Sequence, residues 1–244
     1  MKLKLLPFIL CCFALSACDN DEKETPVKNS SITKEGILSG VIETNGSIGT
    51  SGSVYCLELE NDTEIGVTTI GTGGKFSCKL ANLPAESLSE LNTDVMAGIT
   101  TSDPSAKGGN IETYFKEHSS DNNYYRLVKT NFDLSDYSSY ADIFNGIYVS
   151  SFMYFDKDVK VSGTFNDVED NQQFTLDMDL KKGWNEVVSF TTINTTTFST
   201  SMKMTTTIPD GMKWYVYSED ESGGMDFAPQ KIKINSLPFN LFRK

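Results

Sequence analysis

The sequence predicts an all-β fold, in the form of one or more antiparallel β-sandwiches. Apolar and polar residues alternate with a period of two over most of the chain from residue 36 onward, which is typical of half-buried strands. Turn signals rich in Gly and Asn, such as residues 45–46 and 71–74, separate the alternating runs. Of the 244 residues, 39% are hydrophobic, so the chain has enough apolar material to form a core.

The first group of strands is expected within residues 36–92. The alternating runs cover residues 37–42, 54–59, 65–70 and 76–80. Four short strands with turns at this spacing are typical of a small antiparallel sandwich, and they predict a first module over residues 36–92. Residues 84–91 are expected to form a short helix. Residues 102–110 are rich in Gly, Ser and Pro and are expected to form a loop.

Residues 93–244 predict a second, β-rich region, which is either a separate domain or continuous with the first module. Residues 111–145 have only weak periodicity, and residues 137–144 suit a helical turn or two. Further strands are expected at residues 147–155, 159–165, 174–180, 188–190, 198–208 and 214–217. The alternation is clearest at residues 174–180, because four apolar side chains share one face and polar or charged side chains share the other.

The N-terminus has the features of a targeting segment. Lys2 and Lys4 form a positive start, and the apolar residues 5–15 are too few to span a bilayer as a stable helix. The sequence Leu15-Ser16-Ala17-Cys18 resembles the bacterial lipobox. This resemblance implies that residues 1–17 are a lipoprotein signal peptide and that the Cys18 thiol receives the lipid, with fatty acids such as palmitate. The alternatives are a plain secretory signal and a non-cleaved membrane helix, and the acids after Cys18 argue against the latter.

Residues 18–35 are expected to form a flexible tether between the lipid and the folded part, because they are polar, charged and interrupted by Pro26. The acidic run at residues 19–24 resembles the surface-export signal of Bacteroidetes lipoproteins. This resemblance implies an outer-membrane location with the protein facing the cell surface. Two alternatives remain. One is a protein that faces the periplasm; in enteric-type sorting, an aspartate directly after the cysteine would retain the protein at the inner membrane. The other is a tether whose charge merely keeps it extended.

Two further stretches resemble a protein family. Within residues 36–92, a Gly-x-Val pattern, a short strand and a Gly-x-Phe-x-x-x-Leu pattern follow one another. They resemble the first module of uncharacterised bacterial surface lipoproteins, which is similar to transthyretin-like and carboxypeptidase-regulatory-like β-sandwiches. Residues 154–164 followed by residues 180–187 resemble a strand and a Leu, Lys, Gly-Trp-Asn, Val hairpin of the same families. The resemblance implies a structural or adhesive role and brings no catalytic motif.

Charge and motifs limit the classes of function. The formal net charge of −12 argues against nucleic acids and anionic lipid surfaces as partners, since both require a basic surface. The single histidine, His118, excludes a multi-histidine metal site. The acids at residues 167–170 lack the order of a calcium-binding EF-hand loop, and a solvated loop is the favoured interpretation. No nucleophile-elbow, zinc-protease or phosphate-loop motif is present.

The prediction is therefore a non-enzymatic, lipid-anchored envelope protein without a cofactor or metal, with a glycan or an extracellular protein as its partner. Two alternatives remain open. One is a glycan-processing hydrolase that uses a pair of carboxylates, which need to be near each other only in space. The other is a structural envelope or fimbria-associated protein.

Four residues besides Cys18 are candidates for a site. Export would permit a disulfide between Cys56 and Cys78, but the alternation places Cys78 on an inward face and Cys56 opposite the more apolar set of its strand. Two free thiols are therefore favoured. Trp184 and Trp214, with the ten tyrosines of the chain, would either form an exposed platform that stacks on sugar rings or belong to the core. For Trp184, flanked by residues suited to a tight turn, the core is favoured.

Overall fold

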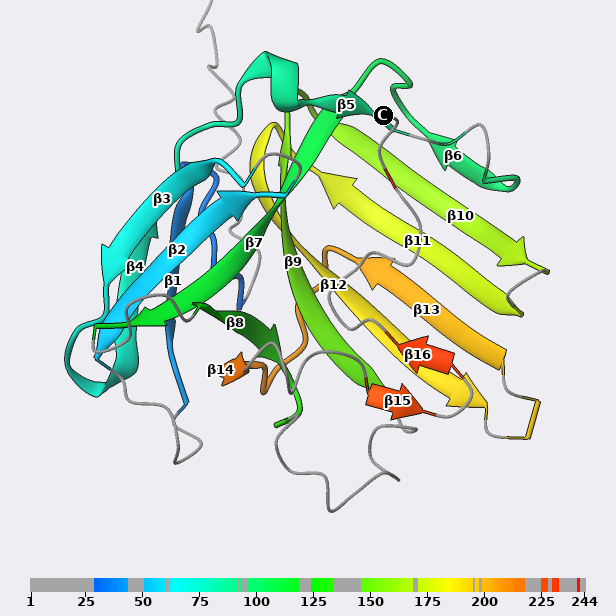
Figure 1. Ribbon diagram of the computed structural model, residues 1–244. Helices are drawn as coiled ribbons and strands as arrows, with labels where there is room; N and C mark the ends of the chain where they lie inside the picture. The colour runs from blue at the N-terminus through cyan, green and yellow to red at the C-terminus, as the bar shows by residue number, and fades with distance from the viewer. Residues whose placement is uncertain are drawn as a thin grey trace, which may run out of the picture.

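The computed structural model describes residues 29–43, 51–59, 62–91, 93, 96–118, 124–133, 146–168, 171–194, 196–197, 199–217, 225–227, 230–232 and 241. Within them the protein is all-β, as predicted. One 12-stranded sheet is accompanied by two sheets of two strands, and the helical segments are two short 3-10 turns, η1 (Thr72–Gly74) and η2 (Ala85–Ser87) (Figure 1).

The first eight strands are β1 (Ile37–Val41), β2 (Gly52–Glu58), β3 (Glu64–Thr69), β4 (Lys75–Lys79), β5 (Ser89–Glu90), β6 (Ile99–Thr101), β7 (Lys107–Glu117) and β8 (Tyr124–Thr130). The others are β9 (Ile147–Phe155), β10 (Val159–Asp167), β11 (Gln172–Leu180), β12 (Gly183–Asn194), β13 (Ser199–Thr205), β14 (Lys213–Tyr217), β15 (Met225–Phe227) and β16 (Gln230–Ile232). In the large sheet the strand order is β3-β2-β7-β8-β9-β12-β13-β11-β10-β6, with β14 beside β8 and β5 beside β7.

Most of the strands expected from alternation are confirmed, but the middle of the chain differs from the prediction. In place of a helix at residues 84–91, the chain forms only η2, followed by β5. The predicted loop at residues 102–110 ends early, because β7 already begins at Lys107. The weakly periodic residues 111–145 contain the end of β7 and all of β8. The last four residues of β8 are all buried, so this strand has no simple alternation in its sequence. The expected helical turn at residues 137–144 lies outside the described residues.

One sheet connects the two regions that were predicted on either side of residue 92. β2 and β7 pair antiparallel over the whole length of β2, from Gly52 opposite Glu117 to Glu58 opposite Ile111. β1 and β4 form a separate two-stranded sheet, which lies behind β2, β3 and β7 in Figure 1. The chain therefore builds a sandwich whose larger layer contains strands from both sequence regions.

The hairpin expected around residues 180–187 is not a paired hairpin. β13 lies between β11 and β12, parallel to β11 and antiparallel to β12. The Asn185 side chain holds the corner where the two strands separate. Its Oδ1 atom accepts a hydrogen bond from the Lys181 amide at 2.8 Å, and its Nδ2 donates to the Lys181 and Gly183 carbonyls at 2.7 and 3.0 Å. These bonds satisfy backbone groups that a hairpin ladder would otherwise pair.

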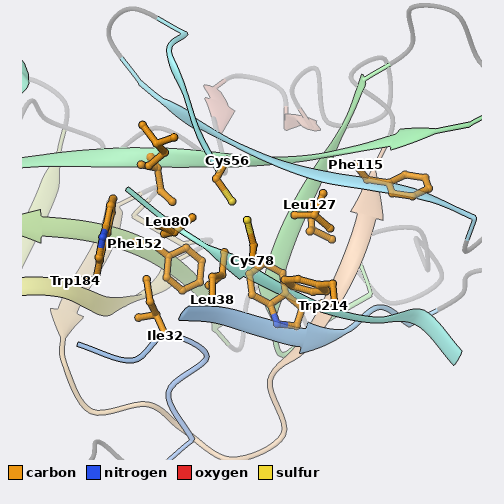
Figure 2. Packing of buried hydrophobic residues seen from close by; sticks show 14 of the residues in the cluster. Ile32, Leu38, Cys56, Cys78, Leu80, Phe115, Leu127, Phe152, Trp184 and Trp214 are labelled. Atoms are coloured by element: carbon orange, nitrogen blue, oxygen red, sulfur yellow. The ribbon is translucent and has the colours of Figure 1, made fainter. Parts of the chain in front are cut away.

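The central strand β9 is buried on both faces, so the sheet serves two cores. Phe152 and Tyr154 belong to a cluster shared with the β1–β4 sheet, whereas Met153 and Phe155 belong to a second cluster with β10, β11 and β13. Figure 2 shows the first cluster, in which aromatic rings from several strands meet side chains of β1 and β4.

Glycines near β1 allow both tryptophans to enter the first cluster. A Cβ atom at Gly40 would lie 2.3 Å from Trp214 Nε1, and one at Gly36 would lie 2.7 Å from Trp184 Cδ1. Separations this short are impossible, so each indole occupies space that any other residue type would fill. Both tryptophans are 3% exposed.

A buried ion pair lies near the first described residues. Lys129 Nζ of β8 donates to Glu186 Oε1 of β12 at 2.7 Å, and the Ser150 hydroxyl of β9 donates to the same oxygen at 2.6 Å. Glu186 Oε2 accepts the Ser31 amide at 2.5 Å, and Lys129 also donates to the Asn29 carbonyl at 3.0 Å. The network therefore fixes residues 29–31 against three strands of the large sheet. These residues were predicted to belong to the flexible tether, so the expectation that the tether extends to residue 35 is wrong, and Ile32 is already buried.

Candidate functional site

The outer face of β2, β7 and β8 carries a set of tyrosines that the sheet register brings together. Along β2, Val54 and Cys56 point into the core, so Tyr55 between them points outward. Tyr55 lies directly opposite Tyr114 of β7, and Lys116 of β7 lies opposite Tyr124 of β8. Cross-strand partners share a face of the sheet, so these side chains all project from the side away from β1 and β4.

The rings of Tyr55, Tyr114 and Tyr124 form one patch, here named the tyrosine platform. The Tyr124 ring meets Tyr55 edge to face, with centroids 5.5 Å apart and an interplanar angle of 76°. It meets Tyr114 in the same way at 6.3 Å and 87°. Tyr124 is 41% exposed, and Val67, which lies opposite Tyr55 on β3, is 48% exposed. The platform thus offers a solvent-facing apolar surface on a rigid sheet.

Charged side chains border the platform and fix its geometry. Arg126 lies over the Tyr114 ring with its Cζ atom 5.1 Å from the centroid, and Lys116 Nζ lies at the same distance over Tyr124. Glu112 pairs with Arg126 and accepts a hydrogen bond from the Tyr114 hydroxyl. Cation–π contacts and a shared carboxylate therefore hold the rings in place and set ionic groups beside an aromatic surface.

This combination has the elements of a binding surface for a polar ligand with apolar faces. Tyrosine supplies a large, rigid contact area at a low cost in conformational entropy, and its hydroxyl can hydrogen-bond. A few fixed polar or charged groups beside such an area orient a ligand. The sequence did not single out these tyrosines, because they lie on three strands and Tyr55 was expected to face inward.

His118, the single histidine, lies near one end of the platform. Its Nε2 atom and the Ser53 hydroxyl are 3.5 Å apart, at the surface. This is a weak hydrogen bond, and a serine is activated as a nucleophile only by a base in close contact that a third group orients. The pair therefore gives no support to nucleophilic catalysis.

Trp184 and Trp214 do not contribute to the exposed surface. Trp184 packs edge to face on Tyr154 at 5.4 Å, and Trp214 stacks on Phe152 with centroids 5.6 Å apart and an interplanar angle of 10°. Their burial in the first core corrects the expectation that they could contact a ligand, and it agrees with the core alternative favoured for Trp184. Among the described residues, tyrosines form the aromatic surface on the outer face of β2, β7 and β8.

Cys56 and Cys78 are both buried, and both are free thiols in this structure. The expectation that Cys56 lies on the less buried face of its strand is wrong. Val54, Cys56 and Glu58 face the core, whereas the larger Tyr55 and Leu57 lie on the outer face. Interaction with the Cys78 thiol, and secondarily burial, raises the pKa of the Cys56 thiol, and interaction with Cys56 lowers the pKa of Cys78.

The remaining predicted features lie largely outside the described residues. Cys18 and the acidic run at residues 19–24 belong to this part of the chain, as do two of the acids at residues 167–170. Among the described residues, no cluster of three or more His, Cys, Asp or Glu side chains is arranged to hold a metal ion. Within the same residues, no helix has the length and apolar character needed to cross a membrane.

Comparison of the chain with protein-family models, with curated proteins and with solved structures finds no match in any of the three. The resemblance to bacterial surface lipoproteins therefore rests on the sequence motifs alone.

Proposed function

We propose that this protein is a lipid-anchored protein of the outer membrane that faces the cell surface and binds a glycan through the tyrosine platform without catalysing a reaction. The lipobox at residues 15–18 supports the anchor, and the acidic run after Cys18 supports surface export. The observation that carries the binding role is the cluster of three tyrosines on the outer face of β2, β7 and β8, bordered by Arg126 and Lys116.

The chemistry of the platform suits a sugar better than a purely apolar or purely anionic ligand. A sugar ring presents C–H groups on its faces and hydroxyl groups at its rim. Tyr55 and Tyr124 would contact the faces, while the ionic groups of Lys116, Glu112 and Arg126 would hydrogen-bond to the rim. The cations in contact with the rings also favour a glycan that carries carboxylate groups, because these would pair with them.

Replacing Tyr124 by alanine is expected to weaken glycan binding by about tenfold or more, because the most exposed ring of the platform is lost. Thermal stability should change little, since Tyr124 is 41% exposed. Binding is measured on an array of neutral and acidic oligosaccharides and then by calorimetry with the best array ligand. Tyr148→Ala is the matched control, because it removes a half-buried tyrosine that stacks on Phe190 away from the platform. Unchanged binding by Tyr124→Ala, or binding of proteins but no glycan by the wild type, would contradict the proposal.

Replacing Cys18 by alanine is expected to abolish acylation and to leave unprocessed or soluble exported protein. Two ester-linked acyl chains anchor a protein stably, since each buried methylene contributes about 0.8 kcal/mol. Cells grown with an alkyne-labelled palmitate analogue report the incorporation, and protease added to intact cells reports exposure at the surface. Alanines at Asp19, Asp21 and Glu22 should retain the label but reduce protease access. A wild-type protein without label would refute the anchor.

A further inference from the structure

Cys56 and Cys78 face each other from two different sheets. Cys56 lies on the inner side of β2 in the large sheet, and Cys78 lies on the inner side of β4 in the two-stranded sheet. Both residues are 0% exposed, and each thiol is the main influence on the pKa of the other. Figure 2 shows the two sulfur atoms pointing toward one another across the core.

Gly66 of β3 leaves room for Cys78 of β4 to lie close to Cys56 of β2. It is the register partner of Cys56, and a Cβ atom added there would lie 2.9 Å from Cys78 Sγ. The Cα atoms of antiparallel partners are only about 4.5–5.5 Å apart. The sulfur of Cys78 therefore lies against the residue directly opposite Cys56, where any larger side chain would push it away.

We propose that Cys56 and Cys78 form a disulfide that ties β4 to β2 across the sandwich. The proposal rests on the export assigned above, because disulfides persist in oxidising compartments. Alternation along the sequence argued against the bond only by placing Cys56 on the opposite face, and the structure removes that argument. The bond would fasten the two-stranded sheet behind the strand that carries Tyr55 of the platform.

The bond forms by thiol–disulfide exchange with a protein disulfide of the export compartment or with glutathione disulfide. One cysteine thiolate attacks the oxidant's disulfide and forms a mixed disulfide, and one oxidant sulfur leaves as a thiolate. The second cysteine then attacks the first sulfur, which joins Cys56 to Cys78 and releases the other oxidant thiolate. The two cysteine protons end on the reduced oxidant. Since both sulfurs are buried in the folded protein, exchange takes place before the β1–β4 sheet closes over β2.

Peptide mapping tests the bond directly. Protein purified from its native host with free thiols blocked is digested with trypsin without reduction. Cleavage after Lys34, Lys75 and Lys79 separates residues 35–75 from residues 76–79, so the two cysteines are carried on different peptides. We expect one linked species that reducing agent divides into the two peptides. Both peptides in blocked, unlinked form would overturn the proposal.

A second arm separates failure of the bond from failure of the proposed location. The same protein is reduced, unfolded in urea and refolded in a glutathione redox buffer, where the linked peptides should form again. If the bond forms in this buffer but is absent from protein purified from cells, the proposal is overturned for the protein in its cell. Absence of the palmitate label at Cys18 would then show that the failure lies in export. Absence of the bond in both arms, with Cys18 acylated, overturns the disulfide alone.

Melting curves give an independent readout of the same bond. The reduced protein should melt about 5–10 °C lower than the oxidised protein. Cys56→Ala should show no linked peptide and no response of its melting temperature to reductant. Equal melting of the oxidised and reduced wild type would contradict a stabilising role for the bond.

Discussion

Trp184→Ala should lower the free energy of unfolding by about 3–5 kcal/mol, which is the cost of removing a large aromatic side chain from a core. Trp184 is 3% exposed, packs on Tyr154 and fills the space left by Gly36. A cavity would therefore open between β12 and the chain at the start of β1. For a chain of this size the melting temperature should fall by roughly 10 °C or more, measured by circular dichroism.

Trp184→Phe is the matched control for this prediction. The Trp184 Nε1 atom is buried and has no hydrogen-bond partner among the described residues. Phenylalanine therefore keeps most of the apolar contact without breaking a hydrogen bond, and it should recover a large part of the lost stability. A Trp184→Ala protein that melts like the wild type would show that the indole is not part of the core, and it would return this residue to the candidates for ligand binding.

Glu186→Ala should destabilise the protein by about 3–5 kcal/mol, because it leaves the Lys129 ammonium group buried without its carboxylate. The side chains of Lys129 and Glu186 are only 5% and 1% exposed. The same change removes the acceptor for the Ser31 amide and the Ser150 hydroxyl. Urea denaturation measures the loss of stability. Trypsin cleavage after Lys34 should also become faster, because the segment around Ser31 is no longer held to the sheet.

The double variant Lys129→Met/Glu186→Leu tests whether the loss comes from an unpaired buried charge. Removing both partners of a buried ion pair is often neutral, whereas removing one is strongly destabilising. The double variant should therefore be more stable than Glu186→Ala and than Lys129→Ala. If the three variants were equally destabilised, the hydrogen bonds to residues 29–31, rather than the ion pair, would account for the effect.

Both predictions concern residues whose importance depends on distant parts of the chain. Lys129 lies in a stretch of weak periodicity, and no local pattern marks a lysine that pairs with a glutamate on β12. Trp184 was singled out because its neighbours Gly183 and Asn185 suit a tight turn. The chain does turn there, between β11 and β12, but these two strands do not pair as a hairpin. β13 enters between β11 and β12, and strand order of this kind is set by packing among segments that are far apart in the sequence.

The sequence predicted the kind of candidate site but not the residues that form it. The sequence suggested an exposed aromatic surface for sugars and named Trp184 and Trp214, the rarest aromatic residues of the chain. The structure buries both and forms the surface from Tyr55, Tyr114 and Tyr124. These tyrosines meet because β2, β7 and β8 are neighbours in the sheet. The spacing of the three residues along the chain does not indicate that these strands are adjacent.

Alternation by itself determined the fold class and the approximate limits of strands such as β4 and β11, because a side chain's face in a strand follows directly from its position in the chain. Only the tertiary structure decided which face of β2 is inside. Tyr55 and Leu57 are more apolar than Cys56 and Glu58, yet Cys56 and Glu58 face the core. Next to Cys56, a Cβ atom at Gly66 would already lie 2.9 Å from Cys78 Sγ, so this position has room for a small side chain only. Hydrophobicity predicts which face of a strand is more apolar. Which side chains are buried also depends on whether their size and shape fit the strand that covers that face.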